Sequence, residues 1–151
     1  MTESTFPQNI GVIDLMLQIP GQSNRAWYDF MQPLFMDEQS RNYEKMPVEY
    51  MFRNVPDIGD RDDYIAYTLE KMDEFGIDKA MIGAQHELSR QALRNHPDRF
   101  FGSYHANPNR GMEEVREIVR YHEEFNIRAV TGFPSGLVPQ VPIDDRRWYP
   151  I

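Results

Sequence analysis

Apolar and polar residues follow two periods along the chain, and the changes between them outline the predicted elements. Short runs of β-branched, aliphatic and aromatic residues, typical of buried strands, lie at 9–20, 77–84, 99–106 and 128–133. Apolar residues at helical spacing lie between them, at 60–75, 87–95 and 111–125. Strands that alternate with helices in this way predict βαβ units and a parallel sheet with right-handed crossovers.

The predicted boundaries rest on residues that cap or stop regular structure. Asp60 is suited to capping the first of these helices, and Gly76 to ending it. Pro97 requires the second helix to end before it, and the run 134–136 (PSG) closes the last strand. The acidic runs near the starts of the first and third helices, 60–63 and 113–117, are interpreted as solvated faces that complement the helix dipole.

A long insertion interrupts the pattern after the first strand. Residues 21–59 carry many aromatic and methionine side chains, Trp27 among them, and a structureless loop of that length is unusual in a compact domain. We expect two short helices in it, near 25–35 and 47–54. The insertion could build a substrate site at the end of the sheet, or its aromatic residues could cap the fold or form a subunit contact.

Charge and composition remove several classes of partner. The net charge of -8 leaves no basic excess to bind nucleic acid or an anionic membrane surface. No cysteine is present, so the chain offers neither disulfides nor a thiolate, which fits a cytoplasmic protein. No apolar run approaches the length of a membrane span, and the N-terminus lacks the pattern of a signal peptide.

Four runs in the chain resemble the amidohydrolase-related family of metal-dependent hydrolases and decarboxylases. Residues 13–20 (IDLMLQIP) are similar to the family's first strand, Ile-Asp-x-His-x-His followed by a proline. The other three runs occur in the family's order: 72–80 (MDEFGIDKA), 96–102 (HPDRFFG) and 144–150 (DDRRWYP). The resemblance implies a (β/α)8 TIM barrel of which residues 1–151 form the N-terminal half, about four βα units, with 21–59 as the insertion. It also implies a small carboxylated or aromatic substrate, and zinc or manganese as cofactor.

The chain departs from this family where the metal should bind. Met16 and Gln18 stand in place of the two histidines of the first strand, and neither a thioether nor a neutral amide suits zinc or manganese. The run 131–134 (TGFP) likewise replaces the family's Lys-Leu-His-Pro. The sequence therefore predicts no metal ligand and no cofactor, and leaves enzyme activity open. The alternative is a non-catalytic barrel subunit, a pseudoenzyme, that binds or stabilises a partner protein.

The chain is short for a whole TIM barrel, which typically needs about 250 residues. We expect a fragment of a longer protein. A natural half-barrel, completed by a second copy or by a partner, is the other possibility. The open edges of such a half-barrel would favour a homo-oligomer.

The candidate substrate-binding residues are those expected where strands end in a parallel α/β fold, together with one from the insertion: Asp14, Trp27, His105, Asn107 and Phe133. No catalytic residue is assigned.

His105 is the histidine at a strand end. His86 is expected to cap a helix or lie at the surface, His96 to be solvated, and His122 to be hydrogen-bonded at the rim of a helix. Asp14 could serve only to bond neighbouring backbone.

Overall fold

The structure is a computed structural model that describes residues 10–21, 32–41 and 58–151. The chain divides into two compact units, one of residues 1–19 and 65–151 and the other of residues 20–64. The second unit contains a 3-10 turn, η1 (Gln32–Leu34), and a short helix, α2 (Glu38–Arg41). Asp37 caps α2, because its Oδ1 accepts the Ser40 N–H at 2.7 Å. The predicted helix at 47–54, most of the one at 25–35, and Trp27 lie outside the described residues.

The first unit is built on a parallel sheet in which the strands follow one another in sequence order. Its strands are β1 (Val12–Asp14), β2 (Ile77–Gly83), β3 (Phe100–His105) and β4 (Ile127–Thr131). All neighbouring pairs are parallel, with Ala80 beside Phe100 and His105 beside Thr131. The predicted parallel sheet and βαβ units are therefore confirmed. Because parallel strands end at one edge, the carboxyl ends of β3 and β4 lie side by side.

The expected TIM barrel is wrong. Within the described residues the chain has a small α/β fold with a curled, four-stranded parallel sheet that does not close. Alternation of strands and helices predicts that the strands are parallel, because each helix carries the chain back to the same end of the sheet. It does not predict closure, which depends on strand number, tilt and stagger.

Three helices connect the strands of this sheet: α4 (Tyr64–Glu74), α5 (Glu87–Asn95) and α6 (Met112–Phe125). Gly76 follows α4 with a φ of +69°, the left-handed conformation that the predicted glycine stop requires. Asn126 ends α6 in the same region, with a φ of +52°. The 3-10 turns η2 (Pro108–Arg110), η3 (Pro134–Gly136) and η4 (Arg146–Trp148) complete this unit.

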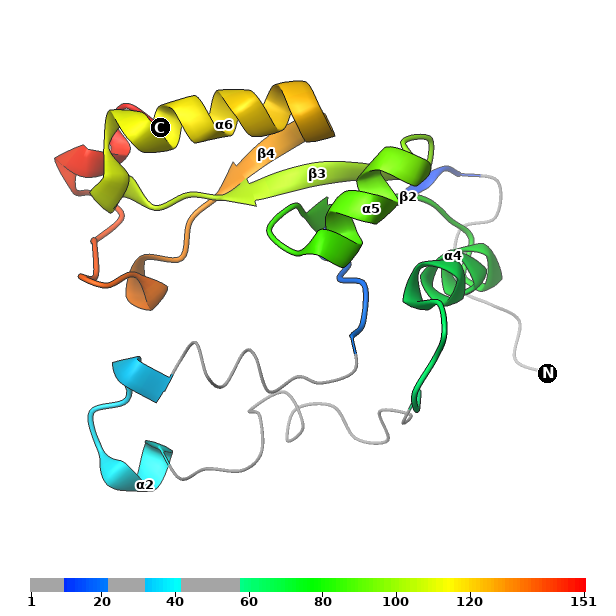
Figure 1. The fold of residues 1–151 in the computed structure, drawn as a ribbon, viewed down its shortest axis with the longest axis horizontal. Coiled ribbons are helices and arrows are strands. Elements are labelled where there is room, and N and C mark those ends of the chain that lie inside the picture. The colour runs from blue at the N-terminus through cyan, green and yellow to red at the C-terminus, as the bar shows by residue number, and fades with distance from the viewer. Residues whose placement is uncertain (1–9, 22–31, 42–57) are drawn as a thin grey trace. The chain divides into compact units, whose positions relative to one another are not determined.

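The core lies between the sheet and these helices. Its buried members lie in, or directly after, α4, β2, α5, β3, α6 and β4: Ile65, Met72, Ala80, Ile82, Ala84, Ala92, Leu93, Phe100, Tyr104, Ala106, Phe125 and Ile127. In Figure 1, α6 runs alongside β3 and β4. Gly102 of β3 lets the Ile127 side chain of β4 pack close to it, because a Cβ at this position would stand 2.7 Å from the Ile127 Cγ2.

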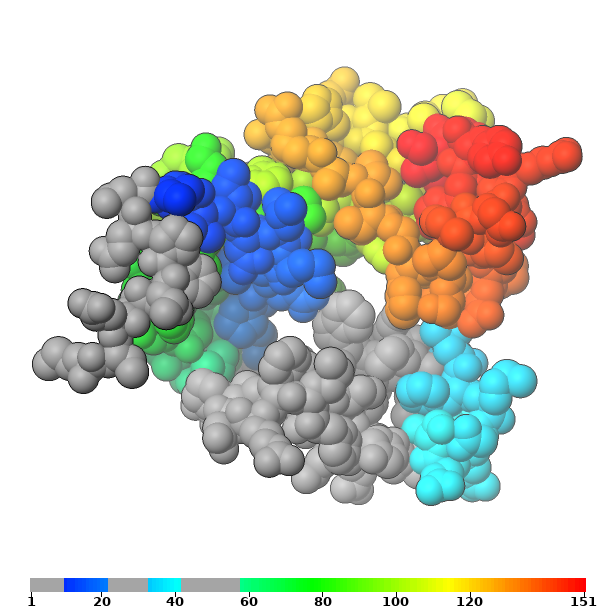
Figure 2. Space-filling view, turned by 180° about the vertical axis from the view of Figure 1, so that it is seen from behind, coloured from blue at the N-terminus to red at the C-terminus, as the bar shows by residue number. Residues whose placement is uncertain are grey.

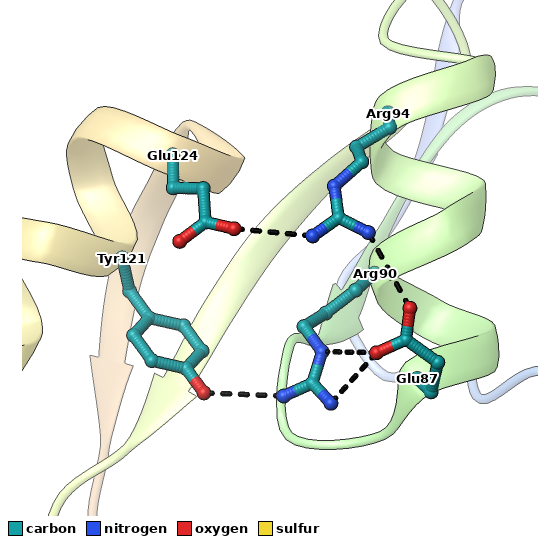
Figure 3. A network of polar contacts seen from close by, with 5 residues as sticks. All are labelled: Glu87, Arg90, Arg94, Tyr121 and Glu124. Atoms are coloured by element: carbon teal, nitrogen blue, oxygen red, sulfur yellow. Dashed lines mark hydrogen bonds and ion pairs between the residues drawn. The ribbon is translucent and has the colours of Figure 1, made fainter.

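A polar network joins α5 to α6 on the outside of this core (Figure 3). Arg90 is paired with Glu87 at 2.8 Å on its own helix, and its Nη1 donates to the Tyr121 hydroxyl at 3.3 Å. Arg94 reaches Glu124 of α6 at 3.1 Å. Such exposed pairs each contribute little to stability. Their value here is to fix how the two helices meet, since Tyr121 also packs against the Tyr104 ring of β3 at 4.8 Å.

The C-terminal segment packs beside β4. Trp148 packs against the backbone of Gly132, where a Cβ would stand 2.9 Å from its ring. Figure 2 shows the last residues of the chain, coloured red, lying against the orange residues that include β4. Arg147 donates to both carboxylate oxygens of Asp145, at 3.0 and 2.9 Å, and to the Asn109 Oδ1 at 2.8 Å. These bonds tie η4 to η2.

Gly102→Ala is expected to destabilise the protein by about 1–3 kcal/mol, because the new methyl group overlaps Ile127 and the sheet must move away from it. Gly21→Ala is the control, since a Cβ there meets no described atom within 4 Å. Urea unfolding measures both. Equal midpoints for the two variants would contradict the close packing at Gly102.

Hydrogen bonds from the Arg147 side chain and N–H lower the pKa of Asp145 from 3.8 to about 2. The folded pKa lies below the unfolded one, so the stabilisation is complete above about pH 4 and is lost as the pH falls through about 2. Carboxyl-detected NMR titration should show this pKa in the wild type and a return toward 3.8 in Arg147→Gln. An ordinary Asp145 pKa in the wild type would contradict the bidentate pair.

Candidate functional site

The candidate site lies where β3 and β4 end together. His105 is the last residue of β3, Thr131 is the last of β4, and the two stand opposite each other in the register. Phe133 follows two residues later, and its ring meets the His105 imidazole edge-on, with 6.3 Å between centroids. A histidine, a hydroxyl and an aromatic ring from two neighbouring strands thus meet at one edge of the sheet.

The contacts of Thr131 are the basis for assigning which nitrogen of His105 carries the proton. The Thr131 Oγ1 donates its one proton to the Tyr104 carbonyl at 3.3 Å. It stands 3.2 Å from the His105 Nδ1 and, having no second proton, can only accept there. From this geometry we assign the ring proton to Nδ1 and the lone pair to Nε2. Among the described residues, the structure gives Nε2 no hydrogen-bond partner.

His105 is neutral under ordinary conditions. Burial of part of the ring lowers its pKa below 6.5, and the negative charge of Glu114 opposes that shift. His105 is nevertheless exposed to solvent, so water or a small molecule can reach it. A neutral imidazole with an unshared lone pair is suited to accept a proton at neutral pH.

Asn107, another predicted site residue, is held by its own neighbours. Its N–H donates to the Glu114 Oε1 at 2.7 Å, and its Oδ1 accepts the Asn109 N–H at 3.1 Å, which caps η2. The side-chain oxygen is thus used to shape the turn after β3. Asn107 therefore lies close to the site, with its oxygen already paired.

Asp14 lies at the end of β1, and β2 stands between β1 and β3 in the sheet. Its Oδ1 accepts the Met16 N–H at 2.8 Å, which is the local backbone bond that the sequence left open as an alternative. Of the predicted site residues, the structure thus brings His105 and Phe133 into contact, with Asn107 nearby, and leaves Asp14 on another strand. Trp27 is outside the described residues.

The side chains at the end of β1 and directly after it do not suit a zinc or manganese ion. Met16 is 89% exposed, and its thioether is a poor ligand for either metal. Asp14 already uses an oxygen to bond backbone. In the described parts of the chain, no three histidine, aspartate or glutamate side chains gather closely enough to hold an ion. We therefore derive no chemical step through a metal.

Sequence reasoning missed two residues that shape this site. Thr131 was seen only as part of a divergent family run, because the register that sets it beside His105 is not visible in the sequence. Glu114 was interpreted as part of a solvated acidic face, yet it is fully buried, at 0% exposed. A signal for Glu114 was present: it is the third residue of α6, from which a glutamate can reach back over the preceding turn.

Comparison of the chain with protein-family models, with curated proteins and with solved structures finds no match. No helix in the described ranges has the length and apolar character needed to cross a membrane.

Nitrogen-15 NMR should show His105 as the Nδ1–H tautomer, with a pKa below 6.5. Thr131→Val removes the acceptor of Nδ1 while keeping the shape of the side chain, so the tautomer should become mixed. His122 is the internal reference, since its Nδ1 can only donate to the Ile127 carbonyl, at 2.9 Å, and should keep its proton in both proteins. A wild-type His105 with the proton on Nε2 would contradict the arrangement.

Proposed function

We propose that this protein acts on a small aromatic or carboxylated compound, in the manner of a hydrolase or decarboxylase, with His105 as a metal-independent general base. The observation that carries the proposal is the neutral imidazole of His105, with its unshared Nε2 lone pair at the carboxyl edge of a parallel sheet. Ligands bind preferentially at this edge in α/β folds. Phe133, 37% exposed beside the imidazole, supplies an apolar surface for an aromatic ring.

The chemistry of hydrolysis at this site follows from the hydrogen bonds. Nε2 takes a proton from a water molecule as the water oxygen forms its bond to the substrate carbonyl carbon. The imidazolium that forms stays bonded through Nδ1–H to the Thr131 hydroxyl, which keeps the ring in place. The same Nε2–H then returns the proton to the leaving oxygen as its bond to carbon breaks, so the base is regenerated.

The relation to the amidohydrolase-related family is part of this proposal and rests on the similar runs at 13–20, 72–80, 96–102 and 144–150. It does not rest on the fold class, which the structure corrects. Met16 and Gln18, in place of the family's histidines, favour chemistry that uses no metal in this chain. A cytoplasmic location belongs to the same proposal and is supported by the absence of cysteine.

One observation favours a second candidate, a non-catalytic subunit that binds another protein or a second copy. Strand β1 is an edge strand, and the apolar side chains of Ile13, Leu15 and Met16, on it and directly after it, are all exposed. Exposed edges and apolar patches of this kind are typical of association sites. This candidate predicts that the protein associates while His105 has no role in binding small molecules.

The experiment uses 4-nitrophenyl acetate, an aromatic ester, as the hydrolysis probe and benzoate as the binding probe. His105→Gln keeps a polar side chain of similar length but has no basic nitrogen. The wild-type rate above the uncatalysed reaction should fall by about 10²-fold in this variant, the lower end of what a general base contributes. EDTA should leave the wild-type rate unchanged, because no metal takes part.

His86→Gln is the matched control. His86 is an exposed histidine before α5, on a neighbouring connection, and its replacement should leave the rate unchanged. Benzoate should shift the NMR signals of His105 and Phe133 in the wild type. Equal rates in the wild type and His105→Gln, or a loss of activity with EDTA, would contradict the proposal. No turnover and no benzoate binding would favour the non-catalytic subunit.

A further inference from the structure

We infer that Glu114 is a positioning residue for His105: from α6 behind the sheet, its carboxylate holds the end of β3 that carries the imidazole. The functional meaning of this inference rests on the proposed role of His105. The physical claim itself concerns the geometry and charge around that ring, and can be tested without a ligand.

Glu114 is fully buried. A carboxylate that is fully removed from solvent is costly unless charges and donors compensate it. The Asn107 N–H donates to Oε1 at 2.7 Å. Oε2 faces the Arg110 guanidinium at 3.0 Å as an ion pair, although no described donor is aligned well enough to hydrogen-bond this oxygen. The Arg110 charge therefore compensates Oε2, and the Tyr104 hydroxyl also lies beside this carboxylate.

Tyr104 directly precedes His105 on β3, and its hydroxyl lies beside Glu114. Burial, together with the charge of Glu114, raises the pKa of Tyr104 to about 12, so its hydroxyl keeps its proton beside the carboxylate. The backbone carbonyl of the same residue accepts the Thr131 hydroxyl, and Thr131 in turn accepts from His105. Tyr104 thus connects the buried carboxylate to the bonds that hold the imidazole.

Glu114 contacts residues on both sides of His105 in the chain. It bonds the backbone of Asn107, two residues after the histidine, and lies against Tyr104, one residue before it. It does not touch His105 in a hydrogen bond. Its negative charge does reach the ring, where it favours the protonated form against the effect of burial. Glu114 can therefore influence both the position of the imidazole and its proton affinity.

Glu114→Gln is the discriminating variant, because a glutamine cannot satisfy both neighbours. If its amide oxygen accepts the Asn107 N–H, its NH2 group points at the Arg110 guanidinium; if the amide turns over, the Asn107 N–H loses its acceptor. Glu113→Gln is the matched control. Glu113 precedes Glu114 on α6, pairs with the same Arg110 at 3.2 Å, and is exposed. Each variant removes one negative charge beside the same arginine.

NMR of the full chain provides the two readouts. In Glu114→Gln the His105 titration should move to lower pH, because the charge that favours its protonation is gone. The Asn107 amide should exchange with solvent about tenfold faster, the loss expected for a hydrogen bond to a charged acceptor. Glu113→Gln should change neither. Equal effects in the two variants, or an unchanged His105 titration in Glu114→Gln, would overturn the inference.

If Glu114→Gln does not fold, NMR of the wild type alone tests the inference. A protected Asn107 amide, together with a fixed Nδ1–H tautomer of His105, would support the inference, and an Asn107 amide that exchanges freely would overturn it. Failure of the proposed function remains distinguishable. In that case His105→Gln leaves the 4-nitrophenyl acetate rate unchanged, while Glu114→Gln still moves the His105 titration.

Discussion

The hydrogen-bond chain from the Tyr104 carbonyl through the Thr131 hydroxyl to the His105 Nδ1 is the interaction on which the account of this protein depends. It exists only because β3 and β4 are parallel neighbours in a register that sets His105 beside Thr131. With the Thr131 hydroxyl donating to the Tyr104 carbonyl, the ring proton is assigned to Nδ1 and the Nε2 of His105 is left as the base. A change of pairing by one residue would turn His105 to the other face of the sheet.

The packing behind the sheet maintains that register. Gly102 lets Ile127 approach the middle of β3, and Tyr121 of α6 packs against Tyr104 near the end of the same strand. The ion pair and the hydrogen bond that join α5 to α6 add little free energy of their own, but they restrain the helix that presents Tyr121 and Glu114. Glu114 adds a polar contact to this packing, because its carboxylate accepts the backbone N–H of Asn107, two residues after His105. The residues of the site are thus held in place by side chains of the helix that covers the other face of the sheet.

Much of the local structure could be predicted from the sequence, because single residues impose it. Pro97 and the apolar spacing before it set α5 at Glu87–Asn95, and Gly76 ends α4 in a conformation that glycine adopts without strain. That the chain is a small α/β fold and not half of a TIM barrel could not be predicted, because neither periodicity nor the family-like runs report on strand number or tilt. In the site, His105 was predictable from its place at a strand end. Thr131 and Glu114 were not, since their roles come from cross-strand register and from burial.

The most direct test of the central claim compares two pKa values in the same wild-type sample. One is the pKa of the His105 imidazole, followed by NMR; the other is the pKa that governs the rate of 4-nitrophenyl acetate hydrolysis as the pH is raised. If His105 is the general base, the rate rises as this ring loses its proton, so the two values should coincide below 6.5. A rate whose pH dependence does not follow the His105 titration would contradict the account.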